Sequence, residues 1–209
     1  HKNDQHKTNN PIITTQKPTA PNHTTYPYFI YSRYCHSPMA RSTDSFFIRA
    51  TQNIGMTSTF DEGAIDLGAY VDALGKSVLR IHNIQVTYSD STGTSNQIDI
   101  GETGVAQWQL TTQSMPDTVL DSNRSVISSG HIHMSNKNTS SLLASNVSDE
   151  NGINLHEWTN GYLVAVEQIY LGGEATAFFQ GNVYVSLVME CTVETLTQSA
   201  AMALALSQQ

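Results

Sequence analysis

The chain has 209 residues and a formal net charge of −8, and only 13% of its residues are charged. A chain of this length forms one sizeable domain or two small ones and buries roughly 70% of its unfolded surface. Ten basic residues against eighteen acidic ones leave no Lys and Arg cluster that could hold a phosphate backbone, so we expect no direct nucleic-acid binding. The sequence lacks an apolar run of about eighteen residues, so we expect no transmembrane helix.

Residues 1–44 differ in composition from the rest of the chain. The first 25 residues hold three prolines among many Thr and Asn residues, and they carry too little apolar surface to become ordered by themselves. An aromatic run follows, and it is either a first strand packed on the domain's own core or an arm that docks onto an adjacent subunit. We predict an extended N-terminal arm with the subunit-contact candidates Tyr26, Tyr28, Phe29, Tyr31 and Tyr34.

Between residues 45 and 134, apolar side chains recur at every second position in several short runs separated by turn residues. This period is typical of strands that bury one face. After Ile81 the apolar parity changes within one run, and such a change marks a β-bulge or a bend between sheets. The runs that predict strands are 45–54, 63–72, 75–89, 97–112 and 125–134.

The most regular pattern lies in residues 161–196, GYLVAVEQIYLGGEATAFFQGNVYVSLVMECTVETL. Its second half, 182–196, alternates apolar and polar residues and predicts a strand whose outer face carries the subunit-contact candidate Tyr184. Residues 162–171 are apolar on both parities, which indicates a strand covered on both sides. Glycines separate the two halves, so we expect them to form a long β-hairpin or meander.

Residues 135–160 form the longest polar passage of the sequence. A loop of this length more often serves a function or an interface than a simple connection. Within it we expect one short helix at 140–145. Two Asn-x-Ser triplets also lie here, so Asn138 and Asn146 are candidate glycosylation sites if the protein passes through a glycosylating compartment.

The last segment, 197–209, changes to Ala, Met and Leu, which are helix formers. Thr197 can cap this helix, and the helix must pack on something because it is apolar. Its apolar residues Met202, Leu204 and Leu206 are candidates for a contact with another subunit.

The number of strands and the scarcity of helix predict the fold class. About eight short strands with turns between them indicate an all-β fold, an antiparallel β-sandwich or barrel. The strand count and the parity change favour a single jelly roll. We expect an extended N-terminal arm at 1–44, the sandwich at 45–196 and a short C-terminal helix with its tail at 197–209.

Few residues form a pattern that catalysis or metal binding requires. His131 and His133 share one face of a strand and are weak candidates for a metal pair. A cupin-type site needs a Glu shortly downstream, and the first nearby one is Glu150. His156 and Glu157 are adjacent, so on a strand they point to opposite sides and do not cooperate as acid and base.

The remaining chemical candidates are acidic residues and cysteines. The acidic residues follow no calcium-loop spacing. Cys35 and Cys191 are either joined in a disulfide or separate thiols. The sequence shows neither a nucleophile elbow nor a phosphate-binding glycine loop, so we expect no enzyme activity, cofactor or metal. The acidic residues considered are Asp61, Glu62, Asp66, Asp72, Asp90 and Asp99.

The final segment, GYLVAVEQIYLGGEATAFFQGNVYVSLVMECTVETLTQSAAMALALSQQ, resembles the closing strands and terminal helix of small jelly-roll capsid proteins of icosahedral viruses, including tailless viruses of microbes. The resemblance implies a coat protein of the virion that assembles in many copies, with other capsid proteins as further partners. The chain departs from many RNA-virus coats because it lacks an Arg-rich arm. This departure fits a shell that a membrane or another protein separates from the genome.

Two other functions fit the same sequence features. The first is a filament, surface-layer or adhesive subunit, located outside the cell or at its surface and assembled by strand exchange. The second is a carbohydrate-binding β-sandwich module. Such a module needs exposed aromatic residues on one sheet face, whereas Trp108 shares the parity of the buried residues. A jelly-roll enzyme of the cupin type has the weakest support.

Overall fold

A computed structural model of the chain describes residues 44–72 and 75–209. These residues fold as an all-β sandwich of two antiparallel sheets with one short C-terminal helix, which confirms the predicted fold class. They belong to one compact unit, Ala40–Gln209. Several residues considered above lie outside the described residues: Tyr26, Tyr28, Phe29, Tyr31, Tyr34 and Cys35.

Each sheet combines strands that are distant in the sequence. The four-stranded sheet has the order β1-β9-β3-β7, with β1 at Phe46–Gly55, β9 at Val183–Thr195, β3 at Ser77–Ser89 and β7 at Tyr162–Val164. The five-stranded sheet has the order β2-β8-β4-β5-β6, with β2 at Asp61–Asp66, β8 at Gln168–Ala175, β4 at Thr103–Thr111, β5 at Val126–Ser135 and β6 at Asn146–Ile153. The helices are the 3₁₀ turn η1 at Leu155–Glu157 and the α-helix α1 at Gln198–Ser207.

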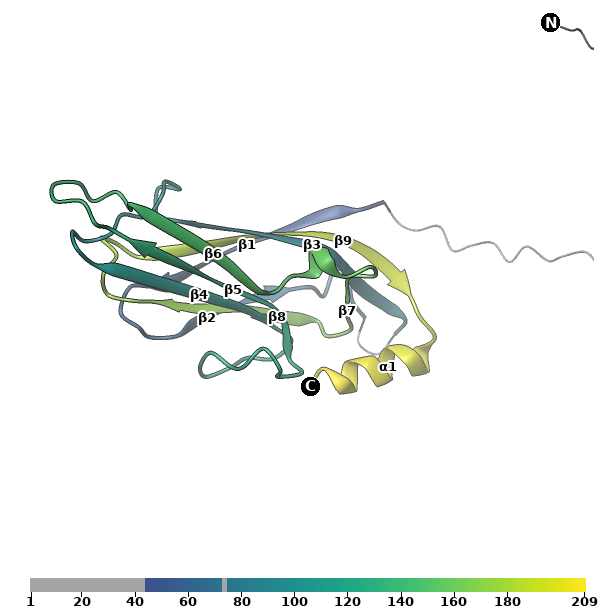
Figure 1. Cartoon of the computed structure of the whole chain (residues 1–209). Helices are drawn as coiled ribbons and strands as arrows, with labels where there is room; N and C mark the ends of the chain where they lie inside the picture. Colours follow the sequence, from purple (N-terminus) through teal and green to yellow (C-terminus); the bar gives the residue numbers. More distant parts are fainter. Residues whose placement is uncertain (1–43, 73–74) are drawn as a thin grey trace, which may run out of the picture. The chain divides into compact units, whose positions relative to one another are not determined.

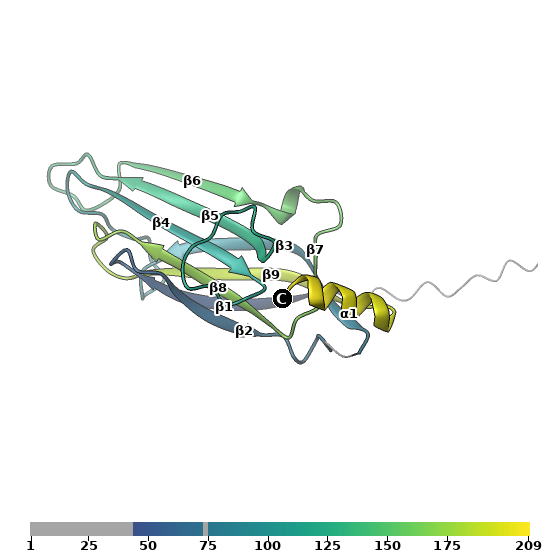
Figure 2. The same ribbon diagram turned by 90° about the horizontal axis from the view of Figure 1, so that it is seen from below.

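The strands pair in a nested manner. β1 pairs with β9, β2 with β8, β3 with β7 and β4 with β5, all antiparallel. A chain paired in this way is one long hairpin rolled into two sheets, which is the jelly roll that the sequence predicts. β6 is an additional strand, and Figures 1 and 2 show it at the outer edge of the five-stranded sheet, beside β5.

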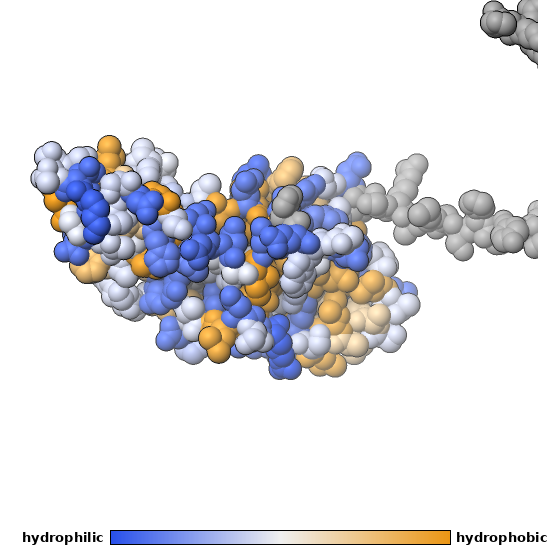
Figure 3. Space-filling model, in the orientation of Figure 1, coloured by the Kyte–Doolittle hydropathy of each residue, from blue (hydrophilic) through white to orange (hydrophobic). Residues whose placement is uncertain are grey.

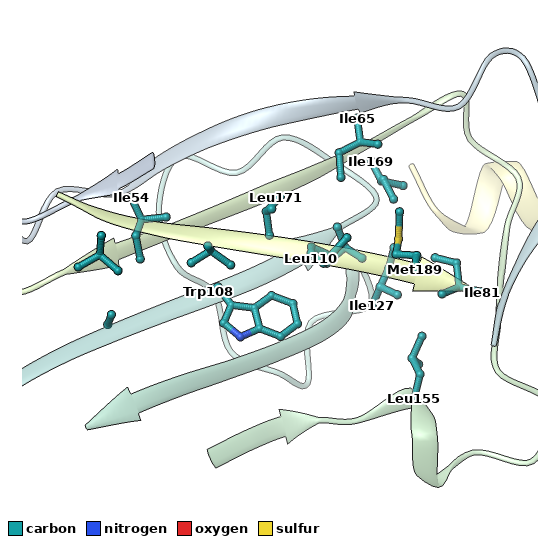
Figure 4. Close-up of a cluster of buried hydrophobic side chains, with 14 of the residues drawn as sticks. Ile54, Ile65, Ile81, Trp108, Leu110, Ile127, Leu155, Ile169, Leu171 and Met189 are labelled. Atoms are coloured by element: carbon teal, nitrogen blue, oxygen red, sulfur yellow. The ribbon is translucent and has the colours of Figure 1, made fainter. Parts of the chain in front are cut away.

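The core lies between the two sheets, where the inward side chains of both sheets meet. In β9 the inward residues Val183, Val185, Leu187 and Met189 are at most 1% exposed, while the residues between them are half-buried. Each buried aliphatic side chain contributes about 1.5–3 kcal/mol to folding. Figure 4 shows Met189 among large buried side chains that come from both sheets: Ile81, Trp108, Leu110, Ile127, Ile169 and Leu171.

The parity change in β3 is a β-bulge, as the sequence predicts. The pairing register between β3 and β9 shifts between Ile81 and Asn83, so His82 is the additional residue. An extra residue in one strand turns the following side chains to the other parity. Ile81 before the bulge is therefore buried in the core, and Ile84 and Val86 after it also pack against the core.

The prediction of a long β-hairpin or meander over residues 161–196 is wrong. β8 pairs with β2 and β4 in the five-stranded sheet, whereas β9 pairs with β1 and β3 in the other sheet. The run is interrupted because the chain crosses between the sheets at residues 165–167, after β7. Both parities are apolar near this crossing because Val164 belongs to the core, while Leu163 and Ala165 pack against α1.

The prediction that residues 135–160 form a long loop is also wrong. This segment contains β6, which pairs with β5, and it contains η1. Residues 140–145 do not form the expected helix. The sequence hides β6 because an edge strand with exposed side chains on both faces shows no alternation of apolar and polar residues.

The C-terminal helix forms where the sequence predicts it. Thr197 is its N-cap, and its side-chain oxygen accepts a hydrogen bond from the backbone N–H of Ala200. This hydrogen bond satisfies one of the free N–H groups of the first turn. In the described ranges, no helix combines the length and the apolar character that crossing a bilayer requires.

Candidate functional site

The inner side of α1 packs on the sandwich through small residues. Ala201 and Ala205 are buried against Val78 of β3 and against Ala165, in an apolar cluster separate from the main core. Small alanine side chains let the helix lie close to the sheet, which fixes the helix as part of the domain.

Gln208, which follows the helix, is buried and joins α1 to the segment after β7. Its side-chain oxygen accepts a hydrogen bond from the backbone N–H of Ala165 at 2.9 Å, and its side-chain nitrogen donates to the carbonyl oxygen of Leu163 at 2.6 Å. The hydroxyl of Thr112 donates to the carbonyl oxygen of Gln208 at 2.8 Å. These hydrogen bonds hold the end of α1 against both sheets.

The outer side of α1 is apolar and exposed. Met202 is 42% exposed and Leu206 is 68% exposed, whereas Leu204 is half-buried against the domain. Figure 3 shows apolar surface gathered over the position of α1 in Figure 1. We call Met202 and Leu206 the α1 face. Two of the three contact candidates of the helix therefore point outward, and Leu204 belongs mainly to the packing of the helix.

An ion pair lies beside α1, between β3 and β9. The guanidinium of Arg80 donates two hydrogen bonds to the carboxylate of Glu194, of which one is 2.9 Å long, and a third to the backbone oxygen of Asn160. The hydrogen bond from Arg80 lowers the pKa of Glu194, and the same bond raises the pKa of Arg80. The pair connects two central strands near the end of the sandwich that carries the helix.

Tyr184 lies on the outer face of β9 and is half-buried. Its neighbours across the sheet are Asn53 of β1 and Ser89 of β3. Near the other end of β1, Phe47 is 55% exposed, and the guanidinium of Arg49 lies 5.7 Å from the centre of its ring. The outer face of this sheet therefore offers one exposed ring and many uncharged polar side chains to a neighbour.

A cleft opens between the sheets at the free edge of β3. β7 pairs only with Leu79–Ile81 of β3, so no described strand lies beside the rest of that edge. The opposite sheet continues there with β5 and β6. We call this space, with a volume of 310 Å³, the β3–β6 cleft. Its walls contain Asn83, Ile84, Gln85, Val86, Tyr88, Trp108, Ser128, Asp149, Asn151 and Asn154.

Tyr88 forms part of the wall of this cleft. Its hydroxyl oxygen is buried and makes no hydrogen bond within the described residues. Burial raises the pKa of Tyr88, and the negative charge of Asp149 raises it further. The nearby Trp108 indole lowers the pKa of Tyr88 by a smaller amount, although it makes no hydrogen bond to the Tyr88 hydroxyl. The phenol therefore remains neutral well above physiological pH.

His131 and His133 lie side by side on β5, as their spacing predicts. Their ring centres are 5.0 Å apart and the rings are nearly perpendicular. The carboxylate oxygen Oε2 of Glu150, which belongs to β6, lies 3.2 Å from Nε2 of His131. Within residues 44–72 and 75–209, no group of three or more His, Cys, Asp or Glu side chains has the arrangement of a metal site.

Several of the acidic residues accept hydrogen bonds from nearby turns. The carboxylate of Asp90 accepts hydrogen bonds from Thr92 and Thr94, and these bonds lower the pKa of Asp90. Asp66 accepts a hydrogen bond from the backbone N–H of Gly68, and Glu62 accepts one from that of Met115. Such carboxylates stabilise turns.

The two glycosylation candidates differ in their surroundings. Asn146 is exposed at the start of β6. Asn138 is half-buried, and its side-chain nitrogen donates a hydrogen bond to the carbonyl oxygen of Leu143 at 2.9 Å. A glycan would require this hydrogen bond to break, so Asn146 is the better placed of the two.

Cys191 faces the core from β9 and is fully buried. Burial raises the pKa of its thiol to about 12, and the charge of Glu190 adds to this shift. A buried, protonated thiol is a poor nucleophile. We therefore assign Cys191 to the core and not to a reactive site.

The sequence did not identify the β3–β6 cleft. Its polar residues come from two strands that are distant in the chain, and β6 itself was not expected. The only signal was the parity change in β3, which places Asn83 immediately after the bulge.

Searches of protein-family models and of curated proteins find no match for this chain. Its function must therefore be inferred from the jelly-roll fold, the α1 face and the β3–β6 cleft.

Proposed function

We propose that the protein is a structural subunit that assembles with copies of itself, as the coat protein of a closed viral shell. The jelly-roll order of the strands supports this proposal together with the resemblance of residues 161–209 to capsid proteins. A fold alone does not determine a function, so the surface must supply the argument.

The observation that carries the proposal is the α1 face. The helix is fixed to the domain by Ala201, Ala205 and Gln208, yet Met202 and Leu206 project into solvent. Apolar side chains on a rigid, exposed element are the kind of surface that a protein interface covers. When the same contact is repeated around symmetry axes, it closes a shell.

The charge of the chain suggests where such a shell would lie. Each copy carries a formal net charge of −8, so it would repel a nucleic acid. The proposed shell therefore meets a membrane or another capsid protein on its inner side. The same charge opposes assembly of the copies, and salt would weaken this repulsion because it screens exposed charges.

A pair of substitutions on the α1 face tests the proposal. The double variant Met202→Ser, Leu206→Ser removes apolar surface from the proposed interface and leaves the buried alanines intact. We expect the unmodified chain to elute as large particles in light-scattering chromatography at about 0.5 M salt, where repulsion between copies is screened. We expect the double variant to elute as a monomer with an unchanged thermal midpoint.

Leu120 provides the matched control for this experiment. It is 80% exposed in the connection between β4 and β5, outside the α1 face. The variant Leu120→Ser loses a similar apolar side chain, and it should form particles like the unmodified chain. If both variants form particles equally well, the α1 face is not the interface.

A filament subunit joined by strand exchange is the second candidate. The free edge of β3 beyond Ile81 favours it, because an added strand could continue the four-stranded sheet next to β7. This candidate predicts fibres in negative stain, and these fibres would survive the substitutions on the α1 face. Closed particles would exclude it.

A further inference from the structure

We propose that the β3–β6 cleft binds a neutral sugar ring. This inference goes beyond assembly and does not depend on it, because the cleft lies within one copy of the chain. The cleft is bounded by the free edge of β3 on one side and by β6 on the other. It exists because β7 ends after three residues while the opposite sheet continues through β6.

Polar side chains without hydrogen-bond partners lie along the cleft. Asp149 and Asn151 line it from β6, on the inward side of that strand. Asn83 and Gln85 border it at the free edge of β3, where their register opposite Glu190 and Val188 places their side chains toward the outer face of the sheet. None of these four makes a side-chain hydrogen bond to a residue that the structure describes. An amide both donates and accepts hydrogen bonds, as does a sugar hydroxyl. A ligand with several hydroxyl groups would therefore pair with the side chains of β6 and with the polar backbone groups at the free edge of β3.

The same cleft also has an apolar part. Ile84 and Val86 line it together with the rings of Tyr88 and Trp108. A sugar ring has hydroxyl groups around its edge and C–H groups on its faces. Polar residues make up most of the lining, and this apolar part lies beside them, as a ring with polar edges and apolar faces requires.

The charge of the cleft lining disfavours an anionic ligand. Asp149 is the only ionisable side chain besides Tyr88 among the described lining residues, which include no Lys, Arg or His. A phosphate, sulfate or carboxylate ligand would meet a negative charge with no cation to balance it. A carboxylate accepts hydrogen bonds from neutral hydroxyl groups, so the proposal commits to a neutral ligand.

The size of the cleft favours a compact ligand over a peptide strand. Its volume of 310 Å³ lies at the lower end of the range for ligand pockets, which is about 300–1,000 Å³. A strand that followed the whole free edge of β3 would need a longer groove. One sugar ring fits better, either free or as one unit of a glycan.

Saturation-transfer NMR on the full chain tests the proposal. The probes are glucose, galactose, mannose, N-acetylglucosamine and N-acetylgalactosamine, with the anionic N-acetylneuraminic acid as a comparison. We expect at least one neutral sugar to receive saturation from the protein and the anionic sugar to receive none. We also expect the double variant Asp149→Leu, Asn151→Leu to bind that neutral sugar about tenfold more weakly, because a carboxylate and an amide are lost from the cleft.

The matched control is the double variant Gln97→Met, Asn182→Leu. Both residues are exposed and lie outside the cleft lining. This variant should bind the sugar as the unmodified chain does. The proposal is overturned if no neutral sugar receives saturation, if the anionic sugar binds more tightly, or if both double variants bind alike. Binding of an alternating Thr-Val peptide without sugar binding would also overturn it, and would assign the free edge of β3 to strand addition.

Discussion

The end of the sandwich that carries α1 and the side that holds the β3–β6 cleft differ in how the polar groups are satisfied. Around α1, the polar groups of Gln208 and Arg80 are paired with backbone and side-chain partners, and the surface that remains is apolar. In the cleft, Asp149 and Asn151 line an open space without side-chain hydrogen bonds, and the hydroxyl of Tyr88 is buried without a hydrogen-bond partner among the described residues.

This difference indicates two kinds of partner. An apolar, rigid surface with its polar groups already satisfied gains most from contact with another protein. A concave surface with free amides gains most from a ligand that forms hydrogen bonds. We therefore propose the α1 face as the assembly surface and the cleft as the sugar site. Substitutions in each region test how strongly the stability of the protein depends on the polar contacts there.

The largest effect is expected at the α1 end, from Gln208→Ala. This substitution leaves the buried N–H of Ala165 and the carbonyl of Leu163 without partners. We expect the free energy of unfolding to fall by about 2–3 kcal/mol and the amides of α1 to exchange hydrogen faster. Urea denaturation and hydrogen exchange measure these changes.

The neighbouring variant Gln209→Ala is the control, because residue 209 has an exposed side chain. It should change the free energy of unfolding by less than about 0.5 kcal/mol. Equal effects of the two substitutions would show that Gln208 does not hold the helix.

A smaller effect is expected from Glu194→Gln, which removes the charge that Arg80 binds. Since both side chains are partly exposed, we expect the free energy of unfolding to fall by only about 1 kcal/mol at neutral pH. The folded state lowers the pKa of Glu194, so the contribution is present above the ordinary pKa of a glutamate and disappears as the pH falls through the lowered value. Urea denaturation at pH 7 and at pH 3 checks this dependence.

The control for this pair is Glu167→Gln, at an exposed position whose carboxylate makes no ion pair with a described residue. It should leave stability at neutral pH unchanged. A Glu194→Gln variant that is as stable as the unmodified protein at pH 7 would mean that the ion pair contributes nothing.

The smallest effect is expected in the cleft, from Tyr88→Phe. Removal of a buried hydroxyl without a partner should leave the free energy of unfolding unchanged or raise it by up to about 1 kcal/mol. A loss of more than about 1 kcal/mol would show that the hydroxyl has a partner in solution, such as an ordered water molecule. Tyr170→Phe, which removes a hydroxyl that donates to Gln168, is the control.

The raised pKa of Tyr88 adds an alkaline test. The folded state binds the phenol proton more tightly than the unfolded state, so stability is complete below the ordinary tyrosine pKa of about 10 and declines as the pH rises above it. The half-buried Tyr162 and the buried Cys191, whose pKa values are also raised, contribute to the same decline. Tyr88→Phe should make the decline shallower in urea denaturation between about pH 9 and pH 11. An unchanged slope would contradict the assignment.

The sequence predicted the elements whose side chains alternate between core and solvent. β9 was recognised because Val183, Leu187 and Met189 face the core at every second position. The helix was recognised from its composition and from Thr197 as its cap. These patterns are local, because each depends on residues within one element.

Features that depend on distant parts of the chain could not be read in this way. β6 has exposed residues on both faces, so its sequence resembles a loop. The periodicity predicts one strand across the crossing after β7 because both faces of the chain are covered there, by the core and by α1. The cleft joins Asn83 to Asp149 only through the nested pairing of the strands, which periodicity does not reveal.

Negative-stain imaging of the full, unmodified chain at high protein concentration tests the central claim most directly. We expect closed particles of uniform size, formed by many copies through the α1 face and the other contacts of the sandwich. A folded chain that remains monomeric under these conditions would contradict the account, and so would open fibres in place of closed particles.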